Sequence, residues 1–209
     1  MANASGDSPF WPAFERLPAD VPEVFRKQLL VGSGERAVLE GQMDRIWVRW
    51  PWLLPLFRLL GIAGLLPERT GKNVPVTLTI SGHKGRNGWS RQMWRRRFDF
   101  RRPKQMVTST VYDTTMGAAF DRLGPLGVFE VRWALEFEAP GTLTLRGDSW
   151  RLRLGPLILP LPSKLTGTPR VVQTAAGEDA MHISFVNEVP VVGEVFGYEG
   201  RFRVRGEAR

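Results

Sequence analysis

Apolar and charged side chains alternate along one stretch of the chain, Phe129-Glu-Val-Arg-Trp-Ala-Leu-Glu-Phe-Glu138. Successive side chains of a β-strand point to opposite faces, so the apolar residues of this stretch share one face and the charged residues share the other. A strand with one face in a core and one in water is typical of antiparallel sheets. Ala139-Pro140-Gly141 then predicts a turn, after which Leu143–Leu154 pairs back.

The same two-residue period recurs from residue 73 to residue 205, interrupted by short turns. The predicted strands of the whole chain are Ala37–Val48, Asn73–Ser81, Trp89–Phe100, Met106–Tyr112, Phe129–Phe137, Leu143–Leu154, Arg170–Thr174, Met181–Val189 and Val195–Val204. Strands do not alternate with helices, so a parallel nucleotide-binding sheet is not expected. We predict a mainly β protein of the α+β class: a strongly curved antiparallel sheet or partly open β-barrel of about 8–9 strands, with two N-terminal helices.

We expect residues 1–209 to form a single domain, with a loose segment at 1–9, helices and a first strand over 10–66, and the sheet over 73–205. Val21, Phe25 and Leu29 recur at a spacing of four, which predicts a helix with Asp20 as its N-cap.

The segment Trp50–Leu66 is the most apolar part of the chain. Two arginines and two prolines fall within or beside it, so a helix that packs on the core or caps it fits better than a membrane span. A contact with a membrane surface is the alternative. Because no secretory signal is visible at the N-terminus and cysteine is missing, we expect a cytoplasmic protein, in the alternative peripheral to a membrane.

Common catalytic and cofactor motifs do not occur. The sequence contains no phosphate-binding loop, no dinucleotide fingerprint, no nucleophile elbow and no zinc-protease motif. With no cysteine and only His83 and His182, a multi-histidine or thiolate metal site is excluded. We therefore predict neither a metal nor a cofactor.

The net charge of +8 is concentrated in one segment, Lys84–Lys104, which holds nine Lys or Arg residues and one acid. The rest of the chain is balanced at twenty basic and twenty acidic residues. Such a localised excess attracts anions more effectively than the same charge spread over the surface.

Arginines and aromatic residues alternate within this basic segment. The candidate ligand-binding residues are Arg91, Arg95, Arg97, Trp89 and Trp94. Strand alternation places the first three on one face with Trp89, and places Trp94, Arg96 and Phe98 on the other. Three interpretations remain open: pairing of the arginines with Glu130, Glu136 and Glu138, binding of an anionic ligand or lipid headgroup, and nucleic-acid binding. A single patch without a nucleic-acid motif argues against the last.

Acid–base candidates are few. They are His182, Glu188, Glu130 and Tyr198. His182 alternates against Met181 and Ile183 and therefore points away from the predicted core, and Glu188 with Glu194 flanks a turn across which the two carboxylates could face each other. Each of them also fits an ordinary structural role.

Several scattered segments resemble one family. They are Leu17-Pro-Ala-Asp-Val-Pro22, Asn73-Val-Pro-Val76, Trp89-x-Arg91 with Arg97-Phe98, Phe120-x-x-x-Gly-Pro125, Leu159-Pro-Leu-Pro162, Met181-His-Ile-Ser-Phe-Val186, Pro190-x-x-Gly193 and Tyr198-x-Gly200. Their order resembles a bacterial domain family of unknown function, often found C-terminal to saccharopine-dehydrogenase-like domains. The resemblance runs from Leu17 to Phe202. It implies no activity, cofactor or catalytic residue, only a role beside lipid or small-molecule metabolism.

Two departures from the family pattern leave a stand-alone role open: the partner domain is not part of this sequence, and Met93-Trp-Arg-Arg96 makes the strand more basic. We hypothesise a protein that binds a small apolar, lipid-like ligand with an anionic end inside the curved sheet. The alternatives are a cofactor-independent acid–base enzyme, such as a cyclase or isomerase, and a module that binds a membrane surface or nucleic acid through the basic strand. No oligomeric state is predicted.

Overall fold

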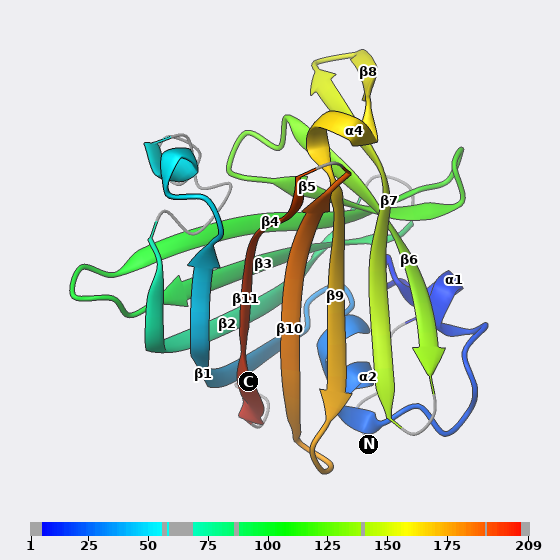
Figure 1. Ribbon diagram of the computed structural model, residues 1–209. Coiled ribbons are helices and arrows are strands. Elements are labelled where there is room, and N and C mark those ends of the chain that lie inside the picture. The colour runs from blue at the N-terminus through cyan, green and yellow to red at the C-terminus, as the bar shows by residue number, and fades with distance from the viewer. Residues whose placement is uncertain are drawn as a thin grey trace.

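A closed antiparallel β-barrel forms the body of the molecule (Figure 1). The computed structural model describes residues 6–55, 58, 69–85, 88–138, 141–190 and 192–205. The strands in these residues are β1 Arg36–Val48, β2 Gly71–Lys84, β3 Ser90–Phe98, β4 Lys104–Asp113, β5 Ala118–Leu123, β6 Phe129–Glu138, β7 Thr142–Leu154, β8 Leu157–Leu161, β9 Thr168–Ala175, β10 Ala180–Val189 and β11 Gly193–Arg205.

Ten of the strands in the described residues close the barrel, and β8 lies outside it. The neighbour order is β6-β5-β4-β3-β2-β1-β11-β10-β9-β7, and the ladder between β6 and β7 completes the ring. All pairings are antiparallel, so the predicted mainly β, antiparallel architecture is confirmed. The predicted number of 8–9 strands was too low, and the barrel is closed rather than partly open.

Two strands were not recognised in the sequence. β5 is short and places Asp121 on its inward face, so the apolar alternation that marks a strand is interrupted. β8 reads Leu-Ile-Leu-Pro-Leu and pairs only with the end of β7, so its side chains lie at the surface and do not alternate in burial.

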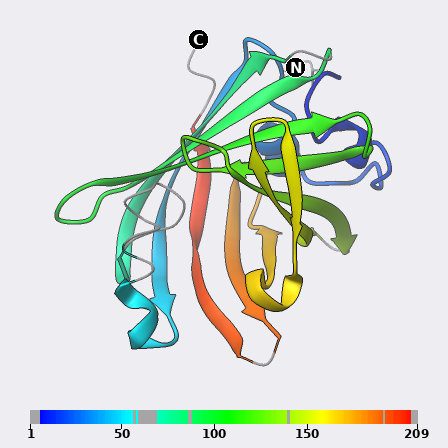
Figure 2. The same ribbon diagram turned by 90° about the horizontal axis from the view of Figure 1, so that it is seen from above.

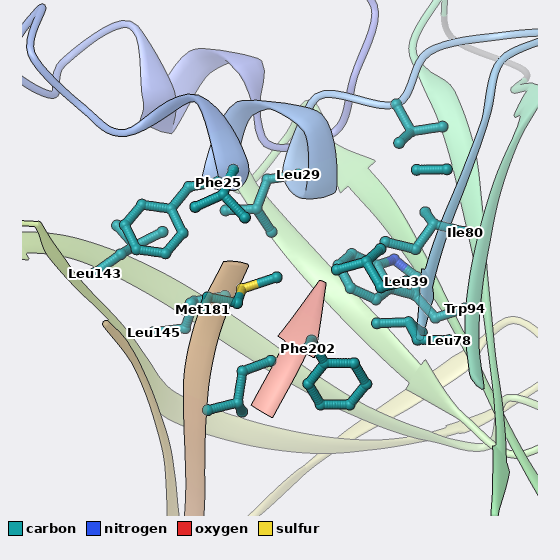
Figure 3. Packing of buried hydrophobic residues seen from close by; sticks show 14 of the residues in the cluster. Phe25, Leu29, Leu39, Leu78, Ile80, Trp94, Leu143, Leu145, Met181 and Phe202 are labelled. Atoms are coloured by element: carbon teal, nitrogen blue, oxygen red, sulfur yellow. The ribbon is translucent and has the colours of Figure 1, made fainter. Parts of the chain in front are cut away.

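Helix α2, Glu23–Leu29, plugs one end of the barrel. It follows the short helix α1, Trp11–Phe14. Phe25 and Leu29 are fully buried and point from α2 toward residues of the barrel wall such as Leu143, Met181 and Leu39 (Figure 3). The plug is also held by polar contacts, because Gln92 Nε2 of β3 donates to the carbonyl oxygens of Leu29 at 2.7 Å and Val31 at 2.8 Å.

The N-cap position of α2 is Pro22, with no side-chain hydrogen bond, rather than the predicted Asp20. Of the apolar segment Trp50–Leu66, the structure describes residues 50–55 and 58, with a 3-10 turn η1 at Pro51–Leu53. The remainder of this segment lies outside the described residues. Among the described residues, the longest apolar helix falls short of what is needed to cross a membrane.

The opposite end of the barrel carries η1, β8, the short helix α4 at Ser163–Thr166 and the connection between β10 and β11 (Figures 1 and 2). Here the wall opens, because β7 pairs with β9 only over Thr142–Arg146 and pairs with β8 over Trp150–Leu154. α4 spans the gap, and Trp150 Nε1 donates to Gly167 O at 2.9 Å.

Candidate ligand cavity

The barrel encloses a cavity of about 430 Å3. At the plugged end it is bounded by Phe10, Gln28 and Leu29, and at the other end it reaches Trp52 and Leu165. Most of its wall is apolar. A volume of this size falls in the ordinary range of small-ligand pockets, about 300–1,000 Å3.

Two side chains carry the charge in this wall. Among the described residues that line the cavity, only Arg96 of β3 and Asp121 of β5 belong to the charged types. Arg96 Nη1 donates to Thr108 Oγ1 at 3.1 Å, and its guanidinium lies 5.4 Å from the centre of the Trp94 ring. The Thr110 hydroxyl donates a hydrogen bond to Asp121. The polar groups therefore form one small region in an otherwise apolar chamber.

Burial changes the acidity of two groups here. Burial raises the pKa of Asp121, and the Thr110 hydrogen bond with the positive charge of Arg96 only partly opposes that effect. Burial also raises the pKa of Tyr198, which lines the cavity from β11; Arg96 opposes the rise and Asp121 adds to it. The positive charge of Arg96 therefore opposes the rise in pKa of both Asp121 and Tyr198.

Several buried polar atoms of the wall have no hydrogen-bond partner among the described residues. They are Trp94 Nε1, Gln28 Oε1, Gln173 Oε1 and Asn187 Oδ1. Each of these side chains is at least nine-tenths buried. An unsatisfied buried polar group costs about 1–3 kcal/mol, and these atoms are covered by neighbouring protein atoms rather than open to the chamber.

Strand alternation and register explain why these polar groups meet. Ser90, Gln92, Trp94, Arg96 and Phe98 share the inward face of β3. On β4, Thr108 is the cross-strand partner of Trp94, and Thr110 is the partner of Asp121 on β5. Directly opposed residues on one face lie within side-chain reach of one another.

The predicted ligand-binding residues divide between the two faces. Trp94 lines the cavity, whereas Arg91, Arg95 and Arg97 lie exposed on the outer face of β3. Arg91 Nη2 donates to Ser109 Oγ at 3.2 Å, and Arg97 pairs with Asp99 at 2.9 Å. Trp89 is half-buried beside Tyr112, with ring centres 4.5 Å apart.

The predicted acid–base residues are likewise dispersed. Tyr198 is buried and lines the cavity. His182 lies on β10 between the buried residues Met181 and Ile183, so its side chain points away from the interior. Glu188 and Glu194 are direct cross-strand partners, as their spacing indicated, but both are exposed and border a separate outer depression with Arg146 and Arg170.

Glu130 is buried in an ion cluster on the outer face of the barrel. Its strand neighbour Val131 lines the cavity, so Glu130 points outward. Its carboxylate accepts from Arg122 Nε at 2.8 Å and lies 2.7 Å from Arg151 Nε, and Arg153 completes the cluster. These partners replace the predicted pairing of Glu130 with the basic strand. For Glu136, the ion pair in this structure is with Arg146 at 3.8 Å.

Asp121 was missed in the sequence. It sits in Phe120-Asp-Arg-Leu123, where neither period nor motif marks a functional carboxylate. Arg96 carried a usable signal, because strand alternation already placed it beside Trp94 and opposite the outer arginines. Within the described part of the chain, no three His, Asp or Glu side chains lie close enough together to hold a metal ion.

One protein family matches nearly the whole chain. Its sequence profile, described as Domain of unknown function (DUF4166), covers residues 17–202, so the chain belongs to this family. The resemblance drawn from scattered motifs covered the same span and is confirmed to that extent. The bacterial setting and the association with saccharopine-dehydrogenase-like domains remain predictions. None of the curated proteins compared with the chain matches it.

Proposed function

We propose that this member of a family without assigned function binds a small, largely apolar ligand in the barrel, with an anionic end of the ligand at Arg96. The observation that carries the proposal is the chamber itself, which is apolar over most of its wall and in which Arg96 is the one cationic side chain among the described lining residues. Ligand pockets combine such an apolar lining with a few placed polar groups that fix orientation.

Arg96 is suited to the anionic end because its guanidinium offers several N–H donors, of which the Thr108 hydroxyl accepts one. Asp121 competes for the same cation only when it is ionised. Because the pKa of Asp121 is raised, part of that competition is removed, and a protonated carboxyl can donate a hydrogen bond to the ligand.

The test compares Arg96→Gln with Arg95→Gln. The two positions are adjacent, but Arg96 lines the cavity and Arg95 is exposed on the outer face. With a fluorescent medium-chain fatty acid as probe, we expect Arg96→Gln to weaken binding by about 1.5–3 kcal/mol, or about 10- to 150-fold in Kd, the usual range for a hydrogen bond to a charged group. Arg95→Gln should leave Kd within about 2-fold of the parent protein.

An uncharged probe, the methyl ester of the same acid, separates charge recognition from packing. We expect Arg96→Gln to change its Kd little, because no anion is lost. If Arg95→Gln weakens binding and Arg96→Gln does not, the outer arginines Arg91, Arg95 and Arg97 hold the anionic end, as the sequence alone indicated. If neither probe binds the parent protein, the proposal is wrong.

A second candidate is a cofactor-independent acid–base enzyme that uses Asp121. A cavity-lining carboxyl with a raised pKa, which acts electrostatically on Tyr198, is the kind of group that general acid–base catalysis requires. Of the four predicted acid–base residues, Tyr198 is the one that lines this chamber. In a screen of cyclic ketones and polyenes followed by mass spectrometry, conversion should be lost in Asp121→Asn and retained in Glu188→Gln. Equal loss in both variants would contradict a role for Asp121.

A further inference from the structure

The rim of the cavity is apolar and exposed. Trp52 of η1 and Leu165 of α4 both line the cavity, yet their side chains are 71% and 79% exposed. Val192, between β10 and β11, combines the same two properties. Side chains that border both the chamber and bulk solvent mark its mouth.

Further exposed apolar residues extend this mouth. β8 contributes Leu157, Ile158 and Leu159, which are exposed, and β8 stands beside α4 at the same end of the barrel (Figures 1 and 2). The apolar surface therefore continues from the interior onto the protruding tips of several separate segments. Exposed apolar surface of this kind marks interaction sites.

Cationic side chains accompany the apolar residues in two described segments at the mouth, η1 and α4. Arg49 lies 5.8 Å from the centre of the Trp50 ring, and Lys164 precedes Leu165 in α4. Only the connection from β10 to β11 carries acids, Glu188 and Glu194, in or beside it.

We infer that this rim docks on a lipid bilayer and that the cavity exchanges its ligand with that bilayer. Tryptophan and leucine tips can insert into the interfacial region while neighbouring Arg and Lys side chains reach the phosphates. Continuity between rim and chamber gives an apolar ligand a path that does not cross water. The inference rests on the proposed function for the ligand and adds the surface that supplies it.

The test uses co-sedimentation with vesicles of phosphatidylcholine alone and of phosphatidylcholine with phosphatidylglycerol. We compare the parent protein with Trp52→Ser/Leu165→Ser and with Met116→Ser, a control that removes an exposed apolar side chain from the β4–β5 connection. The parent and Met116→Ser should bind both vesicle types, more strongly the anionic ones, and the double variant should bind at least about 10-fold more weakly.

Two further measurements make failure informative. The double variant should keep its thermal midpoint, because both residues are largely exposed. A second double variant, Leu157→Ser/Leu159→Ser, changes exposed residues of β8 that do not line the cavity. It should weaken vesicle binding while keeping the Kd for the soluble fatty-acid probe in vesicle-free buffer. A parent protein that binds vesicles but does not bind the fatty-acid probe would contradict the proposed function but not the docking surface.

Three outcomes would overturn the docking inference. The first is vesicle binding by the double variant equal to that of the parent. The second is binding that needs anionic lipid and is lost in Arg91→Gln/Arg95→Gln/Arg97→Gln instead, which would assign it to the basic strand. The third is a parent protein that does not bind vesicles and is a dimer in sedimentation velocity, while the double variant is a monomer.

Discussion

Replacing Glu130 with glutamine should destabilise the protein strongly. The Glu130 side chain is 0% exposed and accepts or faces three guanidinium groups, of which Arg151 is the most buried. Glutamine keeps the shape but removes the negative charge that balances them. Breaking a buried ion pair by removing one partner costs about 3–5 kcal/mol. The arginines still reach water at their edges, so we expect about 3 kcal/mol.

For a domain of this size, about 3 kcal/mol corresponds to a fall of about 6–12 °C in Tm. Differential scanning fluorimetry and urea unfolding at pH 7 measure the two quantities. Glu136→Gln is the matched control on the same strand, because Glu136 is half exposed and its ion pair with Arg146 is long at 3.8 Å. We expect this control to change stability by less than about 0.5 kcal/mol.

The pH dependence of the Glu130 variant tests the cause. Burial alone would raise the pKa of Glu130, but the hydrogen bonds from Arg153 and Arg122 and the positive charge of Arg151 lower it below its usual value of 4.5. The stabilisation is therefore fully present above that usual value and is lost as pH falls through the lowered pKa. The stability difference between parent and Glu130→Gln should shrink on acidification. A difference that is the same at pH 7 and pH 3 would refute the charge-based reasoning.

Two further changes probe the wall of the cavity. Burial raises the pKa of Asp121 above its usual 3.8, so the folded parent protein loses stability as pH rises past that value. Asp121→Asn removes this loss, so the Tm of the variant relative to the parent should increase from pH 4 to pH 8. A difference in Tm that stays constant over this range would contradict the raised pKa of Asp121. Trp133→Ala should lower the free energy of unfolding by about 3 kcal/mol. This value is at the low end of the range for a buried aromatic residue, because Trp133 borders the cavity. A loss below about 1 kcal/mol in urea titrations would show that Trp133 contributes little packing.

The barrel was predictable where one face of a strand is apolar and the other is charged. β6 shows this pattern over its whole length, and the inward set of Phe129, Val131 and Trp133 lines the cavity as the alternation implied. β5 and β8 were not predicted from the sequence. The apolar alternation of β5 is interrupted by an inward carboxylate, and the side chains of β8 lie at the surface without alternating in burial. The hairpin of β6 and β7 was predicted, but closure of the ring was not predictable, because it also depends on ladders between strands that are not consecutive in the chain, β1 with β11 and β7 with β9.

The candidate site was harder to predict than the fold. Its polar groups come from β3, β5 and β11, and no local spacing in the sequence links these segments. The high density of arginines placed the predicted site on the outer face of β3, although charged side chains are ordinary on the solvent-facing side of an antiparallel sheet. The informative residue was Arg96, because a charged side chain on the inward face of a barrel needs a partner or a ligand. Only the register that opposes Thr110 to Asp121 reveals the second half of the site.

The two ends of the barrel together fix the direction in which a ligand would enter. α2 and the Gln92 contacts close one end, whereas the other end opens through the rim of Trp52 and Leu165. Arg96 lies on the cavity wall between the two ends, so the anionic end of a ligand must pass the rim to reach it. On a docked bilayer the apolar tail would stay in apolar surroundings throughout, first in the membrane, then at the rim, then in the chamber. The charged end alone leaves water, and Arg96 offsets part of that cost by a charge-assisted hydrogen bond. A probe with bulky polar groups at its tail should therefore bind more weakly than one with the same groups removed, even though both carry the same carboxylate.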